Sequence, residues 1–254
     1  MEILVCVKRV PATGGRITLT ADRRDIDTSF LGFTVSPHEE CAVEEAVRVV
    51  EAHGGSVTVL TLGPQEAEEQ LRDALALGAD DAVLLEAGGR EWDPIATAEA
   101  IVGTIRARAD AGRAYDLLLF GNEAADSGDH QVPVRVAHAL GLPCVTGVKS
   151  LEIGGGTAVA KREADGGWDV FEVPLPAVLS VKEGMNLPRF PSVPGRLRAR
   201  KRTIERVAPT WRAGGLEKIR LEVPEGQVRG VEVLGDGPDA APKVVEVLEG
   251  MGLV

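Results

Sequence analysis

Short apolar runs alternate with amphipathic stretches through the first 140 residues, and this alternation most constrains the fold. The runs, at residues 3–10, 56–62, 81–86 and 115–121, are rich in Val and Leu. Apolar residues at consecutive positions are typical of strands that helices cover on both faces. The sequence therefore predicts an α/β fold with a doubly wound, mostly parallel sheet of the Rossmann-like type.

The stretches between these runs have helical periodicity. In residues 37–51 the apolar positions form one face, and Glu44, Glu45 and Glu51 lie on the opposite face. Asp93 before Pro94 is a typical helix start. The pattern predicts helices over residues 37–51, 65–77, 94–108 and 130–140.

Beyond residue 142 the pattern changes to strands joined by glycine turns. Residues 145–153, 157–162, 168–173 and 177–182 are predicted strands, and the tight turns between them predict an added antiparallel hairpin region. Residues 183–194 contain three prolines and have no helical or strand period. We expect a nucleotide-binding α/β domain at 1–195 and an extended C-terminal arm at 196–254, with a short final helix at 243–251.

Charge and composition exclude several classes of protein. The formal net charge of −11 argues against a nucleic-acid binder. No apolar run approaches the ~18 residues of a membrane helix, so no membrane insertion is expected. Cys6, Cys41 and Cys144 are spaced for neither a zinc site nor a redox pair, which favours buried thiols in a cytoplasmic protein. No metal site and no catalytic constellation is expected.

The loop after the fourth predicted strand is the best candidate for a binding site, because ligands of such sheets bind at the carboxyl ends of the strands. A helix start follows the loop, and its free N–H groups would suit a phosphate, as in adenine-nucleotide-binding folds. An ordinary capped helix after a strand is an equally good interpretation of this loop. Its three acids, Glu123, Asp126 and Asp129, argue against a bound anion. The loop consists of Gly121, Asn122, Glu123, Ala124, Ala125, Asp126, Ser127, Gly128, Asp129, His130, Gln131 and Val132.

Several motifs together resemble the β subunit of electron transfer flavoproteins over nearly the whole chain. They are Val7-Lys8-Arg9-Val10-Pro11, Ser36-Pro37 followed by Ala42-Val43-Glu44-Glu45-Ala46, Gly63-Pro64 with Ala74-Leu75-Ala76-Leu77-Gly78-Ala79-Asp80, Lys161-Arg162-Glu163 with Leu175-Pro176-Ala177-Val178, and Asn186-Leu187-Pro188-Arg189-Phe190-Pro191.

The resemblance implies a heterodimer with an electron transfer flavoprotein α subunit, which holds most of the FAD, while the β subunit binds AMP in a structural role. Electrons would pass from acyl-CoA or other flavin-dependent dehydrogenases, in fatty acid oxidation for example, to a quinone reductase or another acceptor. Besides the loop after the fourth strand, the resemblance assigns to the AMP site Cys6, Ser36, Pro37, His38, Glu39 and Leu62.

The same resemblance assigns partner contacts and leaves alternatives open. Val193, next to Pro194, would be an apolar anchor for the dehydrogenase, and Glu163 would latch the mobile flavin domain. The C-terminal arm would pack on the partner subunit. In bifurcating members a second FAD replaces AMP in the β subunit. An adenine-nucleotide hydrolase or sensor is the alternative from another class, with Asp126 and Asp129 as candidate Mg²⁺ ligands.

Overall fold

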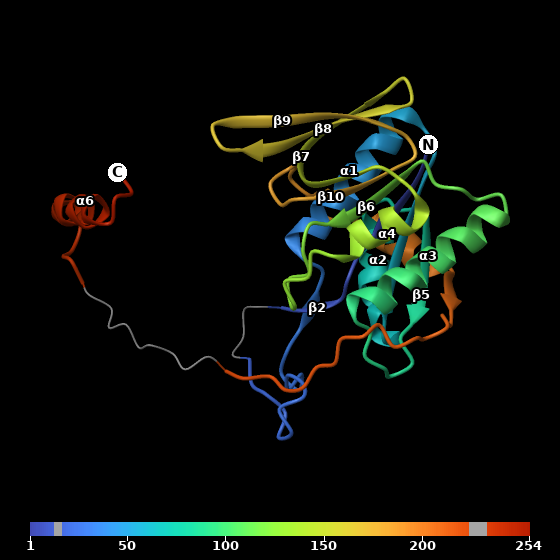
Figure 1. The fold of residues 1–254 in the computed structure, drawn as a ribbon, viewed down its shortest axis with the longest axis horizontal. Coiled ribbons are helices and arrows are strands. Elements are labelled where there is room, and N and C mark those ends of the chain that lie inside the picture. Colours follow the sequence, from blue (N-terminus) through green and yellow to red (C-terminus); the bar gives the residue numbers. More distant parts are fainter. Residues whose placement is uncertain (13–16, 224–232) are drawn as a thin grey trace. The chain divides into compact units, whose positions relative to one another are not determined.

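A nine-stranded sheet organises the larger of the two compact units of the chain (Figure 1). The computed structural model describes residues 1–12, 17–223 and 233–254, and the units are Met1–Ile219 and Arg220–Val254. The strand order is β11-β5-β4-β1-β6-β10-β7-β8-β9. These strands are β1 (Glu2–Cys6), β4 (Ser56–Gly63), β5 (Asp81–Glu86), β6 (Leu117–Gly121), β7 (Cys144–Gly154), β8 (Thr157–Ala164), β9 (Gly167–Pro174), β10 (Ala177–Val181) and β11 (Ile204–Val207).

Pairing within the sheet confirms the predicted topology. All neighbours from β11 to β7 pair in parallel, and β8 and β9 extend the sheet as an antiparallel hairpin. A separate two-stranded ribbon joins β2 (Val10–Pro11) to β3 (Phe33–Thr34). The predicted strand at 3–10 is therefore interrupted after Cys6, and its last residues leave the main sheet.

Helices cover both faces of the sheet, as a doubly wound fold requires. Ile3 and Val5 of β1 join the core beneath α1, α2 and α5, whereas Leu4 and Cys6 face α3 and α4. Alternate residues of one strand thus enter two different cores. The helices are α1 (Pro37–His53), α2 (Glu68–Leu77), preceded by the short 3₁₀ helix η1 (Gln65–Ala67), α3 (Pro94–Asp110), α4 (Val132–Leu140) and α5 (Val193–Lys201).

The strand order places a topological switch point beside β1. The chain proceeds from β1 to β4 and β5 on one side, and then crosses to β6 on the other side of β1. In open α/β sheets the crevice at such a point, outside the carboxyl ends of the strands, is the usual ligand site. Here that crevice lies between the end of β1 at Cys6 and the end of β6 at Gly121.

Two elements, α5 and β11, lie in segments for which no regular structure was predicted. Helix α5 buries only Gly195 and Ala199, so its sequence carries no apolar stripe. Strand β11 pairs with β5 at the edge of the sheet. Both belong to the first unit, which continues to Ile219, so the arm expected from residue 196 begins with structure that belongs to the α/β unit.

The second unit contains the 3₁₀ helix η2 (Pro238–Ala240) and α6 (Ala241–Gly250), which agrees with the helix predicted at 243–251. Several apolar side chains of α6, such as Val244 and Val247, are exposed. In the described ranges, no helix combines the length and apolar character needed to cross a membrane.

Candidate functional site

A pocket opens at the switch point, between the ends of β1 and β6. It has a volume of about 780 Å³, counting its open mouth. The pocket is lined by Cys6, Val7, Lys8, Glu39, Leu60, Leu62, Trp92, Pro94, Thr97, Ile101, Phe120, Gly121, Glu123, Ala124, Asp129, Val132 and Pro133.

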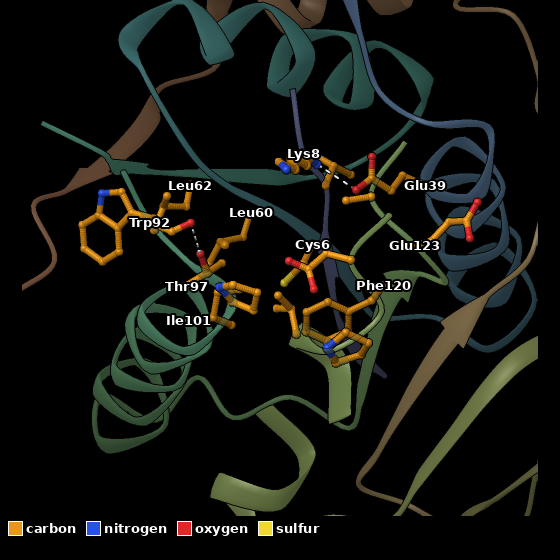
Figure 2. A pocket seen from close by; sticks show the side chains of 17 residues that line it. Cys6, Lys8, Glu39, Leu60, Leu62, Trp92, Thr97, Ile101, Phe120 and Glu123 are labelled. Atoms are coloured by element: carbon orange, nitrogen blue, oxygen red, sulfur yellow. Dashed lines mark hydrogen bonds between the residues drawn. The ribbon is translucent and has the colours of Figure 1, made fainter. Parts of the chain in front are cut away.

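The two sides of this pocket differ in chemistry (Figure 2). Lys8 and Glu39 lie on one side, whereas Trp92 and Ile101 lie on the other, with Cys6 between them. The indole Nε1 of Trp92 donates a 2.9 Å hydrogen bond to the Ala87 carbonyl, which fixes the ring in the wall. A flat apolar group with a polar tail would match this division.

Glu39 is a buried carboxyl group that ties the end of β1 to the start of α1. Its Oε1 accepts the Lys8 N–H at 2.9 Å, and its Oε2 accepts the Ser36 N–H at 3.1 Å. The Ser36 hydroxyl accepts the Glu39 N–H in return, which completes a capping box. Burial raises the pKa of Glu39 to about 8, although both N–H donors oppose the shift. The carboxyl group is therefore mostly neutral at pH 7.

Gly121 allows β6 to approach this buried carboxyl group. A Cβ atom at position 121 would lie 2.7 Å from Cγ of Glu39 and 3.4 Å from Cβ of His38. The first distance is far below van der Waals contact, so a side chain would push the loop away from α1. The glycine is needed here for its small size.

Contacts with basic side chains within and beside the 121–132 loop account for two of its three acids. Asp126 pairs with the Lys8 ammonium at 2.7 Å, and the Glu123 carboxylate lies between two imidazoles. Nε2 of His130 is 3.1 Å from one carboxylate oxygen, and Nε2 of His38 is 3.5 Å from the other. Asp129 remains as the acid that lines the pocket without an ion pair among the described residues.

His38 has a defined tautomer because of the backbone after β10. Its Nδ1 accepts the Glu183 N–H at 2.8 Å, so the ring proton resides on Nε2, which faces Glu123. His38 thus connects the 121–132 loop with the segment after β10. It lies behind the pocket wall and does not line the pocket.

Helix α4 begins later than predicted, at Val132 instead of His130, with Gln131 as the N-cap. No side chain of the described residues caps it. Pro133 has no N–H group, so the N–H groups of Val132 and Val134 are the free donors of its first turn. Within the described ranges the side-chain cap of an ordinary helix start is absent, and this uncapped start borders the pocket at Val132 and Pro133.

The structure brings together part of the predicted site. Eight predicted residues line the pocket: Cys6, Glu39, Leu62, Gly121, Glu123, Ala124, Asp129 and Val132. The other predicted residues do not line it: Ser36, Pro37, His38, Asn122, Ala125, Asp126, Ser127, Gly128, His130 and Gln131. Sequence reasoning missed the wall from Trp92 to Ile101, which precedes and begins α3, and it missed Lys8.

Cys6 is the one cysteine among the residues that line the pocket, and it is buried. Burial, assisted by the nearby Glu39 charge, raises the pKa of the Cys6 thiol far above its ordinary value. A protonated thiol is a poor nucleophile and a poor metal ligand. Within the described ranges, no cluster of three or more His, Cys, Asp or Glu side chains is arranged to hold a metal ion.

Comparison with known proteins agrees with this architecture. The family model for the electron transfer flavoprotein domain matches residues 26–210. The chain belongs to the electron transfer flavoprotein family.

Its relatives within this family are β subunits, which confirms the resemblance seen in the sequence. The electron transfer flavoprotein subunit beta of Bacillus subtilis is 35% identical over 207 residues, covering 81% of this chain and 78% of the relative. The protein of the same name from Syntrophomonas wolfei is 34% identical over 97% of this chain and 95% of its own length. That of Mycobacterium bovis is 38% identical over 80% and 77%.

A second region of this flavoprotein chain, the segment between β10 and α5, presents apolar side chains. Val193 is the first residue of α5 and is 73% exposed, and Pro194 follows it on the surface. Leu187 and Phe190 are more exposed, at 91% and 96%, although the sequence analysis did not single them out. We call residues 187–197 the apolar segment.

Helix α1 holds the apolar segment in place. The Arg189 guanidinium bonds to Glu44, with a closest distance of 2.9 Å, and to Glu51 at 2.6 Å. Asn186 donates to the Cys41 carbonyl at 3.0 Å and to Glu45 at 2.9 Å. These pairs raise the pKa of Arg189 further and lower that of Glu51.

The expected polar face of α1 is partly buried in the structure. The acids predicted opposite its apolar face are not all solvated, because Glu44 and Glu45 are buried beneath the apolar segment.

Glu163, the predicted latch, lies on β8 at the hairpin. Its carboxylate is 53% exposed and is 3.8 Å from the ammonium groups of Lys149 and Lys182. These distances are long for ion pairs at an exposed site, so the carboxylate is held weakly.

Proposed function

We propose that this chain is the β subunit of a heterodimer whose α subunit holds most of an FAD, and that the pocket between β1 and β6 binds AMP in a structural role. The observation that supports this proposal most directly is that the pocket at the switch point has an apolar wall on one side and polar residues on the other. The match to the electron transfer flavoprotein domain and to β subunits favours an electron carrier over an enzyme with its own reaction centre.

The lining residues fit the parts of a mononucleotide. Leu60, Leu62, Trp92 and Ile101 would enclose the adenine ring. The uncapped start of α4 and the Lys8 ammonium would take the phosphate. Asp129 would accept hydrogen bonds from ribose hydroxyl groups. When it is bound, AMP supplies contacts between β1, α3 and α4 and no redox chemistry.

The apolar segment and the hairpin would serve electron transfer between partners. We propose that Val193 and Pro194 dock a flavin-dependent dehydrogenase, that Glu163 contacts the flavin-bearing subunit, and that the C-terminal arm beyond α5 and β11 packs on the α subunit. Electrons would then pass to a quinone reductase or another acceptor. The three free thiols support a cytoplasmic location.

Co-expression with and without the α subunit tests the pairing and the ligand. The expected product is a heterodimer that releases one AMP and one FAD on denaturation. Two FAD molecules per heterodimer would instead indicate the bifurcating type. A stable lone chain that hydrolyses ATP would contradict the proposal.

The docking role has its own test. Val193→Ala should slow reduction of the flavin by the dehydrogenase at low dehydrogenase concentration, without loss of bound FAD. The matched control is Val170→Ala on β9, which is also exposed and lies outside the apolar segment. Equal rates for both variants and the parent chain would contradict the role of Val193.

A further inference from the structure

A second cavity lies between α1, α2 and the apolar segment, away from the proposed AMP pocket. It has a volume of about 1010 Å³, counting its open mouth. Val7, Val43, Leu77 and Pro191 contribute apolar walls, and Phe190 stands at the surface beside it. Nothing proposed so far uses this cavity.

A residue of the cavity lining, Gln70, has a buried amide oxygen without a hydrogen bond in the described part of the chain. Gln70 lines the cavity and is only 3% exposed, and its Oε1 has no hydrogen-bond partner among the described residues. A buried acceptor without a hydrogen bond is unfavourable, so a donor that reaches it from a partner would be favoured.

Two carboxylates share the cavity with this amide. Glu40 on α1 and Asp73 on α2 have no ion pair within 4 Å among the described residues, and Asp73 lies one helical turn from Gln70. Burial raises the pKa of both, and Glu69 adds to the effect at Asp73. Arg196, which also lines the cavity, lowers the pKa of Asp73 but does not pair with it. The carboxylates therefore have no ion pair among the described residues, and the other arginine of the lining, Arg189, is held by Glu44 and Glu51.

The residues that line the cavity suit an arginine side chain better than a metal ion. Within the described ranges no acidic cluster is arranged for a metal ion, and the walls are mostly apolar. An arginine side chain has an apolar stem for such walls and a planar head with five N–H donors. The head would satisfy Gln70 and the carboxylates, and the exposed ring of Phe190 offers a face for stacking.

We propose that the cavity between α1, α2 and the apolar segment binds an arginine side chain of a partner protein, with Gln70, Glu40 and Asp73 as acceptors. The chain's net charge of −11 favours a partner with a basic surface. Since the cavity borders Phe190, the same partner would cover the apolar segment. This inference depends on the residues of the cavity and not on AMP binding.

The test uses the full-length chain and N-acetyl-L-argininamide as the probe. We expect a saturable shift of the Gln70 side-chain amide signal in ¹H–¹⁵N NMR spectra. The uncharged N-acetyl-L-citrullinamide should bind about tenfold more weakly, because hydrogen bonds to charged groups are the strong ones. Asp73→Asn and Glu40→Gln should each weaken probe binding several-fold, whereas Asp165→Asn in the β8–β9 turn should not.

A second variant separates binding from folding. Gln70→Leu should retain or increase the stability of the chain to urea, because it removes an orphaned polar group, and should weaken probe binding about tenfold. The proposal is overturned if no saturable shift appears, if the citrulline compound binds equally well, or if N-acetyl-L-lysinamide binds more tightly. Each of these readouts is independent of dehydrogenase docking and nucleotide content, so failure here would leave the proposed function standing.

Discussion

Two loops that leave neighbouring strands of the sheet are held in opposite ways. The 121–132 loop follows β6, the segment after β10 lies next to it, and both contact α1. The first is fixed by partly exposed pairs, such as Lys8 with Asp126, whose side chains are 42% and 30% exposed. The second is fixed by Arg189 on a carboxylate, Glu44, that is 6% exposed.

The difference indicates what each loop must do. Exposed pairs are worth little and break readily, so the 121–132 loop can open for a ligand and close again. A charge pair with a buried member is costly to separate, so the apolar segment keeps its shape before any partner arrives. Four predictions test this difference between the two loops.

The largest effect is expected from Arg189→Leu. It leaves Glu44 buried without its partner and should lower the free energy of unfolding by about 2–3 kcal/mol, less than for a fully buried pair because Arg189 is partly exposed. Urea unfolding measures the loss. The double variant Arg189→Leu/Glu44→Leu should recover most of it. A loss below about 0.5 kcal/mol would show that α1 does not hold the segment tightly.

Gly121→Ala should have the next largest effect. The new methyl group would overlap Glu39, and the expected cost is about 1–3 kcal/mol with a reduced nucleotide content. Gly103→Ala is the matched control: it lies inside α3 with open space around it and should stabilise the chain by up to about 1 kcal/mol. Unchanged stability in Gly121→Ala would mean that the loop shifts freely.

The raised pKa of Glu39 should make the stability of the chain depend on pH. The folded chain keeps its proton up to about pH 8, whereas the unfolded chain loses it near pH 4.3. Between these values the folded state binds more protons, so its stability falls as pH rises. Compared with Glu39→Gln, which cannot titrate, the parent chain should lose stability from about pH 4 to pH 8 in urea unfolding. Parallel profiles would contradict the raised pKa.

Lys8→Met should have the smallest effect on stability. The pair with Asp126 is exposed, so its loss should cost about 0.2–1 kcal/mol and less at high salt. A double-mutant cycle with Asp126→Asn isolates the pair. A coupling energy as large as that of Arg189 with Glu44 would remove the contrast between the two loops.

The sequence predicted those features that depend on local pattern. The strands of the parallel sheet were found because apolar runs such as 56–62 need burial on both faces, and the strand-end rule then located Gly121 and Cys6. Helix α5 and strand β11 were missed because they carry almost no apolar pattern. Trp92 and Ile101, in the loop after β5 and in α3, also line the pocket, but no motif in the sequence marked them as lining residues.

Helix α1 also limits how this chain can tolerate insertions and deletions. Its first turn positions Glu39 for the pocket, and later turns present Glu44 and Glu51 to Arg189. One residue added between Glu39 and Glu44 would rotate everything after it by about 100° relative to the first turn. No single-residue insertion there can keep both sets of contacts, so length changes in α1 should be selected against even at its exposed positions.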